Sequence, residues 1–153
     1  QCISWFHERD WLKQAGIWMD HGTSLREAHD WLTQSPYLGD FMAYEVVTDL
    51  RYTNVLNMAP DINSWANPGP GAMRGLCRLL GEPLDSRSRS NKADYRWAIG
   101  AMQELLQESW RRPEIADIPK WEMREVEHWL CEFDKYERAY SNEGRMKRVY
   151  KGA

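Results

Sequence analysis

The stretch EVEHWLCEFDKYER, residues 125–138, gathers ionisable side chains of the kinds that carry out proton transfer. Seven of its fourteen residues are formally charged, and a His and a Cys lie among them. At 3.6 residues per helical turn, His128 and Glu132 are neighbours on one face, where the carboxylate would orient the imidazole ring. The same spacing also suits a ladder of ion pairs in solvent, so both interpretations stay open at this point.

No metal site is predicted in this stretch, because one His and one carboxylate four residues apart are too few ligands. The three cysteines, Cys2, Cys77 and Cys131, are widely spaced and form no CxxC pair. This spacing argues against both a zinc site and a disulfide framework. We expect neither a metal nor another cofactor.

The turn NPGPG, residues 67–71, leads directly into a predicted helix and suggests an anion site. Gly69 and Gly71 would let the backbone come close to a ligand, and Arg74 and Arg78 follow one turn apart. Backbone donors, a helix N-terminus and guanidinium groups together suit phosphate or pyrophosphate. The alternative is a loop shaped by packing, followed by two solvated arginines. A P-loop is excluded here, because no GK[ST] follows the glycines.

A second candidate for phosphate contact is the segment SPYLGDFMAYEV, residues 35–46, where a tight turn separates two predicted helices. Backbone N–H groups at the start of the second helix suit a phosphate. The segment resembles the helix-hairpin-helix motif of DNA glycosylases. The matching positions are Leu38, Gly39, Phe41 and Ala43, and Tyr37 stands where the first hairpin glycine is expected. The resemblance implies an all-α, glycosylase-like helical domain that binds DNA.

In such glycosylases a catalytic Asp follows the hairpin by about twenty residues. Asp61 lies in the corresponding region, but the turn at residues 67–71 occupies the stretch that leads into the next helix. A base-excision enzyme therefore remains one alternative, with Asp61 as its weak candidate.

Helices must position these segments, because no alternation of apolar and polar residues is long enough to predict the strands of a β-sheet. We predict helices over residues 4–20, 23–32, 41–52, 71–81, 93–110 and 120–140. The second should open with a capping box in which Thr23 or Ser24 is the cap and Glu27 reaches back. The fourth should end at Gly81. We expect an all-α fold with residues 1–140 as a single helical domain and residues 141–153 as a basic flexible tail.

The net charge of −3 over 153 residues gives no global basic field. The charge is uneven, however. Residues 71–112 hold eight basic and five acidic side chains, and residues 143–153 hold four basic and one acidic. Local phosphate contact fits this distribution, and so does ordinary surface mixing. No apolar run approaches a membrane span and no signal peptide is visible, so we expect a cytoplasmic protein without a membrane partner.

Three blocks in order, FMAYEVVTDLRY, NPGPGAMRGL and EVEHWLCEFDKYER, resemble the helical domain of phage enzymes that hypermodify thymine in DNA. These are the α-glutamyl/putrescinyl-thymine pyrophosphorylases, or amino acid:DNA transferases, and a similar domain accompanies 5-hydroxymethyluracil DNA kinases. The resemblance covers roughly residues 24–138. It agrees with the glycosylase resemblance, because the two families are thought to be related. It implies transfer of an amine, from an amino acid or polyamine, onto the 5-methylene of phosphorylated or pyrophosphorylated 5-hydroxymethyluracil in double-stranded DNA. A phage-encoded protein would act in the host cytoplasm.

The resemblance suggests roles for the final helix and for the phosphate contacts. His128, oriented by Glu132, would be the base that keeps the amine neutral. Asp134 and Lys135 would position the nucleophile or the phosphate. The residues expected to bind phosphate or DNA are Gly39, Arg51, Gly69, Gly71, Arg74 and Arg78.

The buried helix over residues 41–52 is expected to supply the rest of the site. Asp49 and Arg51, near its end, would face the pocket, with Asp49 in a catalytic role. Tyr44 or Trp65 would stack against a base turned out of the duplex.

A second alternative is a non-catalytic helix-hairpin-helix domain that presents DNA to a kinase partner. Catalysis requires the turn at residues 67–71 to lie alongside the ionisable face of the final helix and to form one cavity with it. We take this juxtaposition as the central structural expectation.

Overall fold

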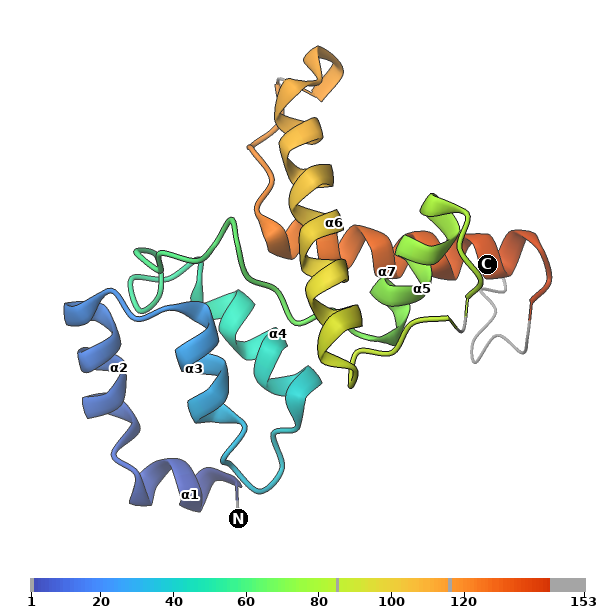
Figure 1. Cartoon of the computed structure of the whole chain (residues 1–153). Coiled ribbons are helices and arrows are strands. Elements are labelled where there is room, and N and C mark those ends of the chain that lie inside the picture. The colour runs from blue at the N-terminus through green and yellow to red at the C-terminus, as the bar shows by residue number, and fades with distance from the viewer. Residues whose placement is uncertain (1, 85, 116, 144–153) are drawn as a thin grey trace, which may run out of the picture.

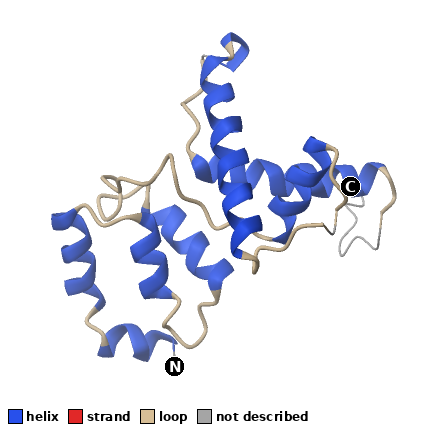
Figure 2. Ribbon diagram, viewed as in Figure 1, coloured by secondary structure: helices blue, strands red, loops and turns tan. Residues whose placement is uncertain are grey.

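The computed structural model describes residues 2–84, 86–115 and 117–143, and these are all-helical, as predicted (Figure 1 and Figure 2). Within these ranges there is no strand. The helices are α1 Cys2–Glu8, α2 Trp11–His21, α3 Leu25–Leu32, α4 Asp40–Leu50, α5 Pro70–Leu80, α6 Lys92–Arg111, the 3-10 turn η1 Pro113–Ile115, and α7 Met123–Tyr140. Residues 144–153, most of the predicted tail, lie outside the described ranges.

The first predicted helix is divided in two at Asp10. This residue adopts a left-handed conformation with φ of 48°, and its carboxylate accepts a hydrogen bond from the Lys13 N–H, so that it caps α2. The division brings the rings of Trp5 and Trp11 together around Trp31 of α3.

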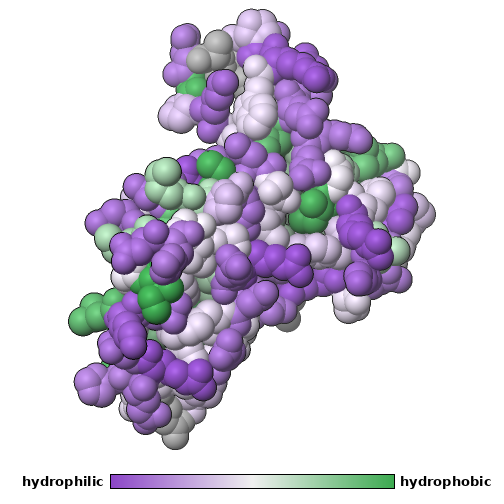
Figure 3. Space-filling model, turned by 60° about the vertical axis from the view of Figure 1, so that its left-hand side comes forward, coloured by the Kyte–Doolittle hydropathy of each residue, from purple (hydrophilic) through white to green (hydrophobic). Residues whose placement is uncertain are grey.

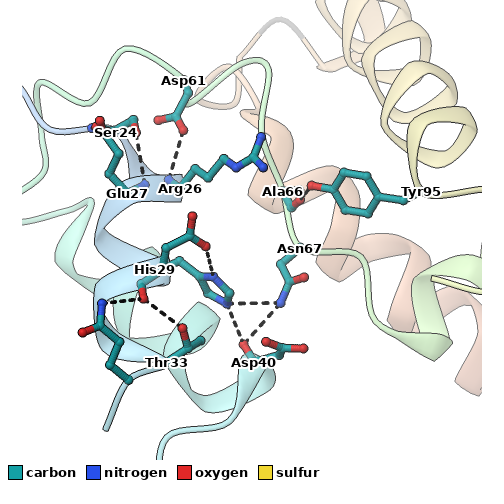
Figure 4. Close-up of polar contacts among 12 residues, drawn as sticks. Ser24, Arg26, Glu27, His29, Thr33, Asp40, Asp61, Ala66, Asn67 and Tyr95 are labelled. Carbon is teal, nitrogen blue, oxygen red and sulfur yellow. Dashed lines mark hydrogen bonds and ion pairs between the residues drawn. The ribbon is translucent and has the colours of Figure 1, made fainter. Parts of the chain in front are cut away.

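Helices α3 and α4 are the two helices that the sequence predicts on either side of a tight turn. The capping box is present, with the Ser24 hydroxyl and the Glu27 carboxylate each satisfying a backbone N–H of the other residue. His29 and Asn67 tie the turn in place, because His29 Nε2 lies 3.1 Å and Asn67 Nδ2 lies 3.2 Å from the Asp40 carbonyl oxygen (Figure 4).

Among the described helices, α5 and α7 make the most extensive contact, and glycine makes their close approach possible. A Cβ atom on Gly75 would lie only 2.3 Å from the Leu130 carbonyl oxygen. One on Gly71 would lie 3.0 Å from Cys131 Sγ. The start of α5 is therefore held directly against the middle of α7.

Helix α6 stands upright between the two groups of helices, and its second half projects from the body of the molecule (Figure 1). Its inward face contributes the buried Met102 and Leu106 to the core. Apolar residues on the face shown in Figure 3 form separate patches among hydrophilic ones. None of the described helices is long and apolar enough to cross a bilayer.

Candidate functional site

A cavity of about 670 Å³ lies between α4, the start of α5 and the polar face of α7. Its volume falls within the range of roughly 300–1,000 Å³ that is usual for small-molecule sites. The central expectation from the sequence is therefore met in geometry, because the glycine turn and the ionisable face of the last helix share one cavity. The predicted site residues that line it are Tyr44, Gly69, Gly71, Arg74, His128, Glu132, Asp134 and Lys135.

Glu127 is the buried carboxylate of this cavity. It is only 4% exposed, and its Oε1 accepts hydrogen bonds from the Gly69 N–H at 3.1 Å and from the Cys131 thiol at 3.4 Å. Burial raises the pKa of Glu127 above its ordinary value, although the Gly69 hydrogen bond opposes the rise. Burial and the charge of Glu127 raise the pKa of the Cys131 thiol to about 12, so the thiol remains protonated.

His128 is oriented by carboxylates other than the predicted Glu132. Its Nε2 lies 3.3 Å from Glu45 Oε1 on α4 and 3.7 Å from Glu127 Oε2. Glu132 is exposed and pairs instead with Lys135. The predicted pairing of His128 with Glu132 is therefore wrong, because the neighbouring helix brings a carboxylate closer to the ring than its own helix does.

Tyr44 is a buried member of the cavity wall. Its ring lies edge-on to Trp65, with centroids 5.6 Å apart, and edge-on to His128 at 6.0 Å. Its hydroxyl is buried and has no hydrogen-bond partner among the described residues. Trp65 does not line the cavity, since it lies behind Tyr44, so the expectation that Trp65 stacks on a base is wrong.

Asp134 binds the two arginines that were predicted to hold phosphate. The carboxylate is 1% exposed and accepts hydrogen bonds from Arg74 at 2.7 and 3.0 Å and from Arg78 at 3.0 Å. Arg78 also pairs with Glu143 and does not line the cavity, so its predicted phosphate contact is wrong. Arg74 keeps 32% of its side chain exposed at the cavity wall and remains available to an anion.

Three further predicted residues lie away from the cavity. Asp49 is exposed at the end of α4. Arg51 pairs with Glu122 at 2.6 Å and so joins the end of α4 to the start of α7. Gly39 is the residue before α4 and does not line the cavity either. The expectation that Asp49 and Arg51 face the pocket is wrong, because both lie beyond the part of α4 that borders it.

Asp61, the weak candidate for a base-excision catalyst, has a structural role. Its carboxylate accepts hydrogen bonds at the start of α3 from the backbone N–H group of Leu25 at 2.7 Å and from that of Arg26 at 3.1 Å. Figure 4 shows the second of these bonds. It does not line the cavity. These contacts remove the support for Asp61 as a catalytic residue in this site.

Several cavity residues were not assigned a role from the sequence. They are Glu45, Asn67, Arg89, Arg124, Glu127 and Cys131. One signal was available for Glu127: it follows Val126 directly and precedes Leu130 by three positions, and so lies next to the apolar stripe of the last helix. No comparable signal marks Glu45 or Arg89, which reach the cavity only through the packing of separate segments. In the described ranges, no three His, Cys, Asp or Glu side chains form a group that could hold a metal ion.

Comparison with known proteins gives one family and one curated relative. Residues 18–146 match the family described as "5-hmdU DNA kinase, helical domain". The chain is 27% identical over 128 residues to the 5-hmdU DNA kinase of Bacillus phage SP10. The aligned region is 78% of this chain but 19% of that protein, so the chain spans about a fifth of the length of the relative that it matches. No solved structure matches.

Proposed function

This chain belongs to the family of 5-hmdU DNA kinase helical domains, and we propose on that basis that it holds a 5-hydroxymethyluracil nucleotide of DNA while the 5-hydroxymethyl group is modified. The base would leave the duplex and enter the cavity between α4, α5 and α7, as enzymes that act on bases require. One observation carries the proposal. The turn at residues 67–71 and the ionisable face of α7 border a single cavity large enough for a small ligand.

Helices α3 and α4, with the turn between them, are suited to guide DNA to this cavity. Gly39 directly precedes α4, and Phe41, two residues later, lines the cavity. A phosphate bound at the start of α4 would therefore lie beside the entrance. We also propose a distant relationship to helix-hairpin-helix glycosylases. We further propose that residues 1–140 form one helical domain and that the basic tail, residues 141–153, contacts DNA.

Phosphorylation of the 5-hydroxymethyl group needs a base near its oxygen and a phosphoryl donor. His128, held between Glu45 and Glu127, is the candidate base. The sequence contains no GxxxxGK[ST] motif, so the nucleotide donor would be bound by a separate kinase part. In this arrangement the helical domain supplies the acceptor and its partner supplies the phosphoryl group.

Amine transfer is the second candidate function, and the two carboxylates beside His128 support it. Glu45 and Glu127 would attract an amino acid or polyamine cation into the cavity, and one of the three groups would take the proton that makes the amine nucleophilic. The new bond joins the amine nitrogen to the 5-methylene carbon. The carbon–oxygen bond to phosphate or pyrophosphate breaks, and Arg74 would stabilise the departing anion.

One experiment tests both functions on the full chain. DNA that bears 5-hydroxymethyluracil, its phosphate or its pyrophosphate is incubated with the protein, candidate amines and, in parallel, ATP and a DNA kinase. Nucleoside mass spectrometry then identifies the products. We expect amine adducts for a transferase, and kinase-dependent phosphorylation that this chain increases for a presenting domain. If the chain neither changes any product nor prefers 5-hydroxymethyluracil DNA in binding, the proposal is wrong.

His128→Ala is the matching variant for a catalytic role. It should lower turnover by about 10²–10⁴-fold if His128 is the base. His21→Ala is its control, since His21 is exposed at the end of α2 and does not line the cavity. Equal activity of wild type and His128→Ala would remove the catalytic assignment but leave base binding to be tested separately.

A further inference from the structure

Two buried side-chain atoms of the described residues have no hydrogen-bond partner, Tyr44 Oη and Arg124 Nε. Both residues line the same cavity. Folded proteins leave few buried polar groups unsatisfied, and each exception calls for a physical explanation. Because the two exceptions coincide at one site, a ligand that satisfies both is the simplest explanation.

Tyr44 is held firmly in the cavity wall by its neighbours. The residue is 2% exposed, and the rings of Trp65 and His128 meet it edge-on from two sides. Burial raises the pKa of Tyr44 well above its ordinary value, and the charge of Glu127 adds to the rise, whereas the nearby backbone N–H of Asn67 opposes it. The hydroxyl is therefore protonated and can donate a hydrogen bond.

The guanidinium group of Arg124 is held in place by two neighbouring side chains. Its guanidinium lies over the Tyr52 ring, 5.3 Å from the centroid, and its Nη1 donates to Glu125 Oε1 at 3.2 Å. The hydrogen bond to Glu125 engages one terminal nitrogen, and Nε–H remains a donor that no described residue accepts. An arginine can donate but cannot accept, so its ligand must offer an oxygen or an unprotonated nitrogen.

Glu127 adds an acceptor to these two donors. Its Oε1 is engaged by Gly69 and Cys131, whereas its Oε2 has His128 Nε2 at 3.7 Å, beyond hydrogen-bond distance. The cavity thus offers a hydroxyl, a guanidinium N–H and a carboxylate oxygen.

We infer that Tyr44 and Arg124 hydrogen-bond the carbonyl oxygens of a uracil-type base that is turned out of DNA into this cavity. A uracil ring carries two carbonyl acceptors and one N–H donor, which matches two donors and one carboxylate. This inference rests on the proposed function, since it specifies how the base is held. It also changes the role expected for Tyr44 from stacking to hydrogen bonding, because a residue that is 2% exposed presents little ring face to a base.

The test uses single-stranded oligonucleotides that differ at one position and binding to the full chain measured by fluorescence anisotropy. That position holds 5-hydroxymethyluracil, thymine, an abasic analogue or difluorotoluene, which has the shape of thymine without its strong hydrogen-bonding groups. The variants are Tyr44→Phe and Arg124→Lys, which keep size or charge. Their matched controls are Tyr95→Phe, which loses a 3.0 Å bond to the Ala66 carbonyl outside the cavity, and Arg96→Lys.

We expect the wild type to prefer thymine and 5-hydroxymethyluracil to difluorotoluene by about tenfold or more. Each cavity variant should reduce this preference by about five- to tenfold, as expected for one hydrogen bond, and the controls should leave it unchanged. Thermal unfolding separates the roles further. Tyr44→Phe removes a hydroxyl without a partner and should not lower the melting temperature, whereas Tyr95→Phe should.

Retention of the full preference for thymine over difluorotoluene by both cavity variants would overturn the inference and leave the proposed function standing. A wild-type protein that binds all four oligonucleotides equally would contradict the proposed function itself. A loss of preference in Tyr44→Phe and Tyr95→Phe alike would also count against the inference, because a general structural effect would then explain both.

Discussion

At Asp134, a single carboxylate fixes two arginines of the neighbouring helix, and its removal should be costly. Asp134→Ala would leave Arg74 and Arg78 without their shared buried partner, which typically costs about 3–5 kcal/mol. Urea denaturation measures this loss. Glu132→Ala is the matched control on the same helix, since the exposed pair with Lys135 should contribute no more than about 1 kcal/mol. Equal costs for the two variants would contradict this account.

The pH dependence of stability should show opposite contributions from Asp134 and Glu127. Burial alone would raise the pKa of Asp134, but its arginine partners outweigh burial and hold it below the ordinary value. Its contribution is therefore present above the unfolded-state pKa and is lost as pH falls through the folded one. Burial raises the pKa of Glu127, so its contribution is present at low pH and is lost as pH rises through the folded-state pKa.

Glu127→Gln isolates the second contribution, because the amide is neutral at every pH. We expect the variant to gain thermal stability relative to wild type as pH rises from 4 to 8, while base binding or turnover falls. Glu45, His128 and Tyr44 face the same cavity and are present in both proteins, so the difference between the two melting curves reports Glu127. A difference that shrinks with rising pH would show that the carboxylate is stabilised in its charged form.

Residue types and spacing identified the segments that form the cavity, but they did not identify which side chains contact one another within it. The ionisable face of residues 125–138 and the turn at 67–71 were both found from the sequence, and they do border one cavity. The partners of His128 could not be found in this way. Helical periodicity places Glu132 beside His128, but it says nothing about Glu45, which the packing of α4 against α7 brings within 3.3 Å.

Among the helices, the contact of α5 with α7 depends most on a single position. Gly75→Ala would place a Cβ atom 2.3 Å from the Leu130 carbonyl oxygen, and backbone cannot give way as a flexible side chain can. We expect a loss of roughly 3 kcal/mol or more, since the two helices must separate. Gly100→Ala in α6 has no heavy atom within 4 Å of its new Cβ and should gain up to about 1 kcal/mol from helix propensity. Chemical denaturation of both variants checks the contrast.

The role of Asp61 can be tested at the start of α3. Asp61→Ala removes the acceptor of two backbone N–H groups and should cost about 1–2 kcal/mol, as the loss of a helix cap does. Because Asp61 does not line the cavity, any activity should persist after correction for folded protein. Loss of activity in a fully folded Asp61→Ala protein would restore the base-excision alternative.

Element boundaries followed the sequence wherever a local signal exists. The capping box at Ser24 and the end of α5 at Gly81 are encoded within a few residues, and both are present. The break at Asp10 was missed because the aromatic residues on both sides continue a helical spacing. Only the packing of Trp5 and Trp11 around α3 requires the chain to turn there.

Among the described helices, the extensive contacts fall either within α1–α4 or within α5–α7, and polar side-chain pairs join the two sets. Arg51 and Glu122 form one such junction, with both side chains less than one-fifth exposed. A double-mutant cycle of Arg51→Ala and Glu122→Ala should therefore give a coupling free energy of about 1–3 kcal/mol. Arg51→Ala should also weaken base binding without touching the cavity, because α4 carries one of its walls. Independent effects of the two substitutions would show that the junction contributes nothing.

The walls of the cavity come from α4, α5 and α7, and α7 follows the other two along the chain. During synthesis, α4 and α5 therefore emerge from the ribosome well before their partner exists. A nascent chain that ends within α6 exposes the face of α5 that carries Gly75, and it lacks the wall of the cavity that α7 supplies. Nucleotide affinity should thus arise abruptly, when translation passes α7, and prematurely terminated chains should be both inert and readily proteolysed.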